Sequence, residues 1–335
     1  MTSRRTVPAL ASMMLVGLVG VTLHAAGVFG AFTASNGNPA NSFSTASDYR
    51  APTAGRSVIA KTQGGTPGYI RAGGTYYVYA DVTDTGNPAS GVSTVTSNTS
   101  TLTGLGTSTP LSSGSFSIGG LSYGYRTASL TATSSLVEGT YAYTLTSTDA
   151  AANSGTQSFS VVVDNTAPTA GDVQTANGNG GTPGRAEAGD TITLTYSEPI
   201  DPNSIISGWN GSATNVVVRL INGILLLGDD ALRVYDSTNT NQLPLGTVDM
   251  GRGDYVGGLL GGETALFGAT GSPSTMTASG NSVTITLGTA SGQGATTAGG
   301  NGTMSWTPSG TATDRAGNGA LTTPASESGS ADKDF

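Results

Sequence analysis

The segment Ala-Pro-Thr-Ala-Gly at residues 51–55 returns at residues 167–171, and Gly-Gly-Thr-Pro-Gly at residues 64–68 returns at residues 180–184. Both pairs of segments are 116 positions apart, so the register holds without a gap. A constant spacing is poorly explained by chance similarity between glycine-rich loops, and it is well explained by duplication of the opening of a structural module. The sequence therefore predicts two modules, each of which begins with this repeat.

The first module is predicted to consist of short β-strands. Residues 75–83 alternate so that Tyr76, Val78, Ala80 and Val82 share one face, which is the pattern of a half-buried strand. Clusters of Gly, Ser, Asn and Pro separate further expected strands, which lie at residues 92–96, 115–118, 128–132, 141–146 and 158–163. About seven short strands in one module favour a β-sandwich.

The second module is longer than the first. A closing turn with the pattern Thr-Asp-x-Ala-x-Asn occurs at residues 148–153 and again at 313–318, which is an offset of 165 positions. The openings are only 116 positions apart, so an insertion of about 50 residues is predicted inside the second module, near residues 215–255. There, the segments 215–220 and 224–227 flank Asn222-Gly223, and this arrangement predicts a hairpin that extends the sheet. Any specific binding function is expected on this insertion or on exposed loops.

Several motifs resemble those of bacterial immunoglobulin-like (Ig-like) domains. Residues 139–145 and the turn at 148–153 are similar to the penultimate strand and the following turn of such domains, and residues 189–199 resemble the opening strand of another bacterial Ig-like family. The resemblance implies that Tyr141 is a corner tyrosine and that Asp149 caps the closing turn. The expected fold is all-β, with two tandem Ig-like β-sandwiches at residues 51–166 and 167–335, the second enlarged by the insertion, after an N-terminal signal helix.

The N-terminus has the pattern of an export signal. Arg4 and Arg5 precede an apolar stretch without charges, residues 7–29. We predict a signal peptide over residues 1–30; cleavage after Ala25 and an uncleaved membrane anchor are the alternatives. The membrane is expected to contact the chain only through this segment, if it is uncleaved.

Residues 31–50 are predicted to be a flexible spacer. The region 30–46 resembles the cleavage region of the camelysin and biofilm-matrix family. This resemblance covers fewer than twenty residues, so it implies secretion and does not extend the matrix function of that family to the remaining chain.

The charge composition disfavours a nucleic-acid partner. The formal net charge is −8, the arginines are scattered, and Lys61 and Lys333 are the only lysines. Cysteine is absent, so the modules are expected to rely on packing without disulfides. Both lysines lie near module ends, which disfavours the isopeptide staples of some surface adhesins.

Calcium is the one cofactor that the sequence suggests. Isolated aspartates near the module junctions could supply oxygen ligands, or they could simply cap turns. These residues are Asp84, Asp149, Asp164, Asp201 and Asp314.

Catalysis is not expected. The carboxylates of Glu187, Glu198 and Asp201 could suggest glycoside hydrolysis, but the mature chain lacks the Cys and His that most nucleophilic or acid–base chemistry uses. The tripeptide Arg-Gly-Asp at residues 252–254 is a weak integrin motif in so glycine-rich a chain.

The two tryptophans carry different predictions. Trp209 lies in a Gly-Asn turn and is the candidate for stacking on a sugar, whereas Trp306 alternates with Met304 in an expected strand and is predicted to be core. The expected function is therefore that of a non-catalytic secreted or cell-surface structural or adhesion protein, whose partner is an unidentified cell-surface glycan or protein. A carbohydrate-binding or enzyme-accessory module and a matrix-fibre subunit are the alternatives.

Overall fold

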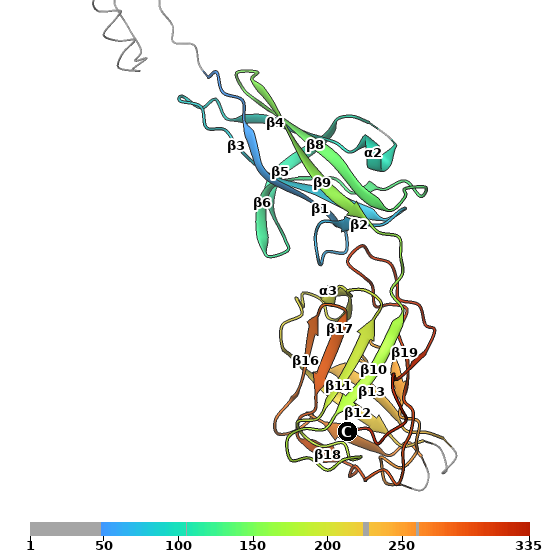
Figure 1. Ribbon diagram of the computed structural model, residues 1–335. Coiled ribbons are helices and arrows are strands. Elements are labelled where there is room, and N and C mark those ends of the chain that lie inside the picture. Colours follow the sequence, from blue (N-terminus) through green and yellow to red (C-terminus); the bar gives the residue numbers. More distant parts are fainter. Residues whose placement is uncertain (1–47, 105, 224–227, 259–260) are drawn as a thin grey trace, which may run out of the picture.

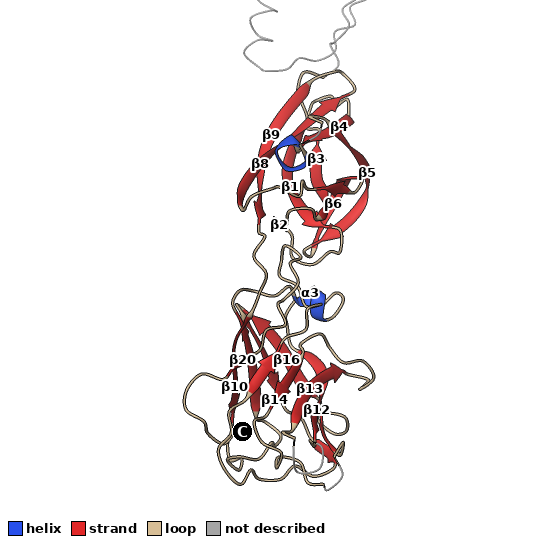
Figure 2. Cartoon of the chain, turned by 90° about the vertical axis from the view of Figure 1, so that its right-hand side faces the viewer, coloured by secondary structure: helices blue, strands red, loops and turns tan. Residues whose placement is uncertain are grey.

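A computed structural model describes residues 48–104, 106–223, 228–258 and 261–335, and the predicted signal peptide and nearly all of the predicted spacer lie outside these residues. The described chain is almost entirely β-structure, arranged as two bodies placed end to end (Figures 1 and 2). Residues 164–169 connect the last strand of the first body to the first strand of the second. No helix in the described ranges has the length and apolar character needed to cross a membrane.

The first body contains the elements β1 Thr53–Lys61, β2 Tyr69–Ile70, β3 Thr75–Thr83, β4 Val92–Asn98, α2 Ser100–Thr103, β5 Thr109–Ile118, β6 Leu121–Thr127, β7 Leu130–Thr131, β8 Gly139–Asp149 and β9 Ser154–Val163. The second contains β10 Ala170–Ala176, β11 Thr191–Tyr196, α3 Pro202–Ile205, β12 Thr214–Ile221, β13 Ala231–Asp236, β14 Thr247–Asp249, β15 Thr264–Phe267, β16 Ser274–Ser279, β17 Ser282–Thr286, β18 Ala290–Gly292, β19 Ser305–Thr307 and β20 Ala325–Ser326.

The first body is a β-sandwich whose strands follow the order β1-β3-β6-β5-β4-β8-β9-β2, with β7 beside β3. Its core lies between β1 and β3 on one side and β8 and β9 on the other. Tyr76 and Val78 of β3 share this core with Tyr143 and Leu145 of β8, which confirms the predicted inward face of β3. The Tyr141 hydroxyl donates to the carbonyl of Val137 at 3.0 Å, the hydrogen bond expected of a corner tyrosine.

The opposite face of β3 is also covered, so this strand is not half-buried as predicted. Tyr79 is only 5% exposed and packs against Tyr123 of β6. The Arg126 guanidinium lies 4.2 Å from the ring centroid of Tyr77 and 4.4 Å from that of Phe116. The outer face is therefore covered by an aromatic and arginine cluster contributed by the β5–β6 hairpin.

The sheet of the second body follows the order β10-β11-β17-β16-β12-β13-β14-β19-β20, with β15 and β18 attached beside β12. Ser328, just after β20, donates its backbone N–H to Asp172 of β10 at 2.8 Å, so the two ends of the sheet approach each other. Trp306 is fully buried at the centre of this body and meets the Tyr196 ring edge-on at 4.7 Å. The prediction that Trp306 is a core residue is thus confirmed.

The stretch near residues 215–255 contributes paired strands to the sheet, as expected, but these strands lie in the middle of the sheet. It supplies β12, β13 and β14 to the middle of the sheet, and its Val218, Leu220 and Val234 are buried in the core. The expected tight hairpin turn at Asn222-Gly223 is wrong, because Ile221 pairs with Ala231 and the connection between the two strands is longer. The expected partner strand at 224–227 lies outside the described residues. Burial of alternating apolar side chains on both strands places this stretch in the fold itself.

Candidate functional site

A buried ion pair joins the two sandwiches. Lys61, the last residue of β1, directs its Nζ to Asp201 Oδ2 at 2.5 Å, and the two side chains are only 6% and 2% exposed. The same Nζ donates to the carbonyl oxygens of Asp314 at 3.0 Å and Arg315 at 3.1 Å. All three ammonium hydrogens therefore have acceptors on the second sandwich, as a buried charge requires. We call this arrangement the Lys61 clamp.

The loop after β1 closes over Asp201. Gly65 has φ +88°, and a Cβ at this position would overlap the Asp201 carboxylate. Thr66 Oγ1 approaches Asp201 Oδ1 at 3.4 Å, and the Asn203 side-chain amide donates to the carbonyl of Gln63 at 3.3 Å. The first copy of the Gly-Gly-Thr-Pro-Gly repeat is thus a docking loop that needs glycine at residue 65.

The second copy of the repeat makes different contacts. Gly184 donates its N–H to the carbonyl of Phe335 at 2.8 Å, and its own carbonyl accepts from Ala298 at 2.8 Å. These contacts lie within the second sandwich. Identical sequences therefore occupy equivalent loops with unrelated neighbours.

Asp201 stands at the start of α3, which explains its position. Its carboxylate accepts from the backbone N–H of Asn203 at 3.3 Å, the contact of a helix N-cap. Asp201 was a calcium candidate, with turn capping as the alternative; the structure places its carboxylate against Lys61 and at the N-cap of α3. Asp201 therefore forms a structural ion pair and is no longer a calcium candidate.

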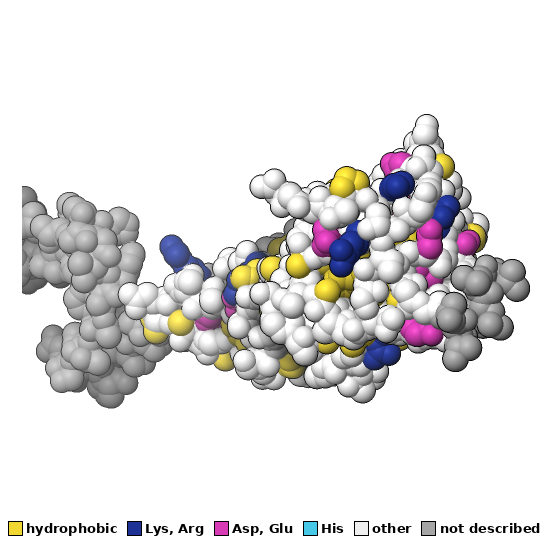
Figure 3. Space-filling view, turned by 90° about the horizontal axis from the view of Figure 1, so that it is seen from below, with side chains coloured by type: hydrophobic (Ala, Val, Ile, Leu, Met, Phe, Trp, Pro, Cys, Tyr) yellow, Lys and Arg dark blue, Asp and Glu magenta, His cyan; other side chains and the backbone are white. Residues whose placement is uncertain are grey.

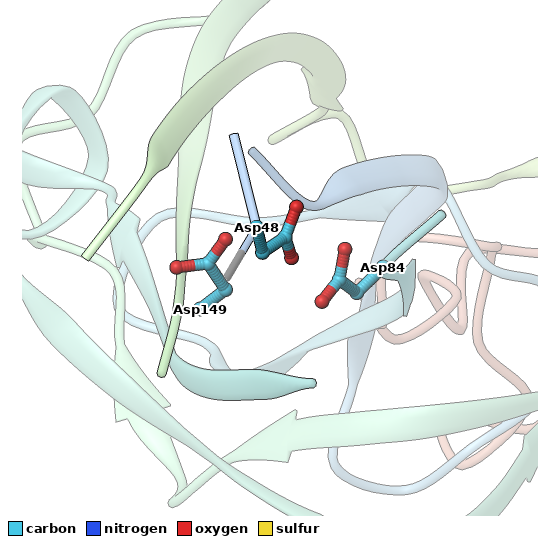
Figure 4. Close-up of side chains that lie close together, drawn as sticks. All are labelled: Asp48, Asp84 and Asp149. Atoms are coloured by element: carbon cyan, nitrogen blue, oxygen red, sulfur yellow. The ribbon is translucent and has the colours of Figure 1, made fainter. Parts of the chain in front are cut away.

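The other four calcium candidates, Asp84, Asp149, Asp164 and Asp314, do join acidic clusters. The first cluster comprises Asp48 before β1, Asp84 after β3 and Asp149 at the end of β8; the carboxylates of Asp48 and Asp84 face each other, and Asp149 lies beside Asp48 (Figure 4). One oxygen from each lies within 4.8 Å of the others. Asn153 holds two of them, since it donates to Asp149 Oδ2 at 2.7 Å and to the Asp48 carbonyl at 3.0 Å. The expected capping of the turn by Asp149 is confirmed by its bond from the Asn153 N–H at 2.8 Å.

Backbone donors satisfy much of the first cluster. Asp48 accepts from the N–H of Arg50 and that of Ser90, both at 2.9 Å, and these bonds hold the pKa of its carboxyl below the usual range. Asp84 accepts from the N–H of Gly91 at 2.7 Å. The hydrogen bonds of the first cluster therefore connect the segment before β1 to the loops that follow β3 and β8.

The second cluster, formed by Asp164, Glu198 and Asp314, has the same construction at the junction. Asn318 donates to Asp314 Oδ2 at 2.8 Å and to the Asp164 carbonyl at 2.9 Å, as Asn153 does in the first cluster. Asp164 lies 116 residues after Asp48, which is the spacing of the repeat. The duplication thus includes the acidic cluster.

The second cluster is less well satisfied than the first. Glu198 Oε1 is shielded from solvent and has no hydrogen-bond partner. Burial, together with the negative charges of Asp164 and Asp314, raises the pKa of Glu198 to about 7. Burial also raises the pKa of Asp314. Three carboxylates with an unpaired buried oxygen form a donor set suited to a hard divalent cation such as calcium.

A third cluster, Glu327, Asp332 and Asp334, lies beside the end of the chain. Burial raises the pKa of Glu327 to about 7 and that of Asp334 to about 6. The Tyr255 hydroxyl donates to Asp334 Oδ2 at 3.0 Å. Sequence reasoning missed this cluster because no spacing signal marks it.

Asp48 was missed for another reason. It falls within the predicted flexible spacer, yet it is 6% exposed and belongs to the first cluster. Continuing the 116-residue register three positions upstream of the repeat would have paired it with Asp164.

The remaining candidates have structural contacts. Trp209 is not exposed as expected: it belongs to the core, is 9% exposed, and donates its indole N–H to the carbonyl of Ser212 at 2.6 Å. Glu187 accepts from the N–H of Thr182 at 2.8 Å. Arg252 and Asp254 of the Arg-Gly-Asp tripeptide bind each other at 2.6 Å.

Charges on the outer end of the second sandwich are mixed. On the face shown in Figure 3, Lys and Arg side chains are scattered among Asp and Glu side chains. No protein-family model matches the chain, and no curated protein matches it. The Ig-like and camelysin-like resemblances therefore stay predictions.

Proposed function

We propose that the chain is a non-catalytic secreted or cell-surface structural or adhesion protein whose two Ig-like β-sandwiches act as one fixed, end-to-end unit. The Lys61 clamp carries this proposal. Two domains joined by a short linker ordinarily move relative to each other unless their interface holds them. Here a desolvated ammonium group finds its three acceptors only in one docked arrangement, which specifies the relative orientation of the sandwiches.

The carboxylates considered for glycoside hydrolysis support a non-catalytic role. Asp201 binds Lys61, Glu187 binds a backbone N–H, and Glu198 belongs to the second acidic cluster with Asp164 and Asp314. These three carboxylates thus make separate structural contacts and do not form a pair. Secretion is proposed from the signal pattern of residues 1–30 and from the camelysin-like region.

Distance measurements between spin labels test the fixed unit. Because the chain has no cysteine, labels can be attached to Ser112→Cys and Ser279→Cys, two exposed positions in different sandwiches. We expect one narrow distance distribution, broadened by Lys61→Met and unchanged by Lys333→Met, since Lys333 is the other lysine of the chain and is exposed. A broad distribution in the unsubstituted chain would refute the proposal.

Fractionation of the native culture separates the alternatives for the whole protein. Recovery with the cell wall supports adhesion, recovery in sedimentable fibres supports a matrix-fibre subunit, and recovery only in the medium supports an accessory module. Hydrolysis of glycans that is lost on Glu198→Gln would contradict a non-catalytic role.

Calcium binding by Asp164, Glu198 and Asp314 is a second candidate function. The buried, unpartnered Oε1 of Glu198 is the observation that favours it, because a cation would supply the missing partner and offset the repulsion among the carboxylates. Calcium is expected to raise the melting temperature at about 0.1–1 mM, the range of extracellular modules.

A matched pair of variants locates the ion. Glu198→Gln should abolish most of the calcium-induced shift, whereas Asp84→Asn at the equivalent position of the first cluster should leave it. Equal shifts in the unsubstituted chain and the Glu198→Gln variant would rule out this site.

A further inference from the structure

A cavity of about 610 Å³ opens between the two sandwiches beside the Lys61 clamp. Residues from both bodies line it: Arg71, Gly73 and Gly74 from the first, and Ser207 and Thr313 from the second. Its volume lies within the range of small-molecule sites, which often form at domain interfaces. Lys61 and Asp201 of the clamp are themselves among the lining residues.

The lining is polar and carries one available positive charge. The charge of Lys61 is neutralised by Asp201, whereas the Arg71 guanidinium is exposed and makes no hydrogen bond or ion pair within the described ranges. Ser207 and Thr313, which carry hydroxyl groups, line the same cavity, and Ile70 and Ala316 are apolar residues at its wall.

We infer that this cavity binds a carboxylated saccharide, of the uronic acid class. The Arg71 guanidinium can hold a carboxylate through two parallel hydrogen bonds. Serine and threonine hydroxyls both donate and accept, which matches the ring hydroxyls of a sugar. This inference rests on the fixed junction of the proposed function.

Titration of the ¹⁵N-labelled chain with glucuronate, glucose and acetate tests the inference by nuclear magnetic resonance. Glucuronate is expected to shift the amide signals of Gly73, Gly74 and Gly317, which line the cavity. Glucose lacks the carboxylate and acetate lacks the hydroxyls, so each should bind at least about tenfold more weakly than glucuronate. Glucuronate binding no tighter than acetate would overturn the saccharide assignment, and the absence of shifts at these glycines would overturn the site.

Two substitutions and one control define the contacts. Arg71→Gln should weaken glucuronate binding about tenfold, and Ser207→Trp should block the cavity. Arg50→Gln, an exposed arginine near the opposite end of the first sandwich, should leave binding unchanged. Equal losses in the Arg71 and Arg50 variants would indicate non-specific attraction and would refute the inference.

The spin-label distances distinguish failure of this inference from failure of the proposed function. A narrow distance distribution without glucuronate binding would overturn the ligand and leave the fixed unit standing. A broad distribution, recorded without any sugar, would instead overturn the fixed unit.

Discussion

Replacing Lys61 with Met should uncouple the two sandwiches. The methionine side chain can occupy most of the volume of the lysine stem, so the main loss is the charge and its hydrogen bonds. Asp201, 2% exposed, would keep only Thr66 Oγ1 and the N–H of Asn203 as donors, and the carbonyl oxygens of Asp314 and Arg315 would lose theirs. Breaking a buried pair by removing one partner costs about 3–5 kcal/mol.

This cost should appear where the junction contributes to stability. Both tryptophans lie in the second sandwich, so their fluorescence follows its unfolding, whereas circular dichroism follows both bodies. In chemical denaturation, Lys61→Met should lower the free energy of unfolding of the second sandwich by up to about 3–5 kcal/mol, limited by the free energy of docking. Its fluorescence transition should move accordingly to lower denaturant concentration.

Two further variants make the test specific. Lys333→Met removes an exposed charge and should change the free energy of unfolding by no more than about 0.5 kcal/mol. The double variant Lys61→Met with Asp201→Leu should be more stable than Lys61→Met alone, because it leaves no unpaired buried carboxylate. A Lys61→Met variant as stable as Lys333→Met would refute the reasoning.

Three other predictions concern the docking loop, the acidic clusters and the core. Gly65→Ala should weaken the junction and broaden the spin-label distance distribution, because its Cβ would overlap the Asp201 carboxylate. Gly64→Ala is the matched control, since Gly64 also has a positive φ but has open space around it. Equal effects of the two substitutions would contradict the close approach of Gly65 to Asp201. Burial raises the pKa of Glu198 from 4.5 to about 7, so the folded state favours the protonated form, and without calcium the free energy of unfolding of the second sandwich should fall as pH rises from about 5 to 7. Glu198→Gln should reduce this pH dependence by about 1–2 kcal/mol, a figure lowered to allow for the partial exposure of Glu198. Chemical denaturation in the presence of a chelator measures it. A free energy of unfolding that rises from about pH 5 to 7 would contradict the raised pKa of Glu198. Trp209→Ala should cost about 3–5 kcal/mol of stability in the same denaturation assay, because Trp209 is a core residue, and a stable variant would contradict its burial.

Much of the fold could be predicted from local patterns. Alternation in residues 75–83 identifies β3 because neighbouring side chains point to opposite faces of a strand. The pattern did not reveal that Tyr79 on the outer face is buried, since that depends on the β5–β6 hairpin folding across it. The strand expected at residues 215–220 corresponds to β12, but its pairing partner is β13 at Ala231–Asp236 and not the segment that directly follows Asn222-Gly223.

The candidate site was only partly predictable. Asp149, Asp164 and Asp314 were identified from the junction motifs, and each belongs to an acidic cluster. Asp201 was assigned to the wrong partner, because Lys61 lies 140 positions away and nothing in either local sequence signals the contact.

The amino-acid sequence by itself determined two duplicated modules, their strand character and the acidic residues at their closing turns, because repeats and alternation are properties of local segments. Only the tertiary structure decided which carboxylates remain unpaired and that Lys61 joins the two modules. Pairing and desolvation depend on which distant segments pack together, and identical loops such as residues 64–68 and 180–184 therefore acquire different neighbours.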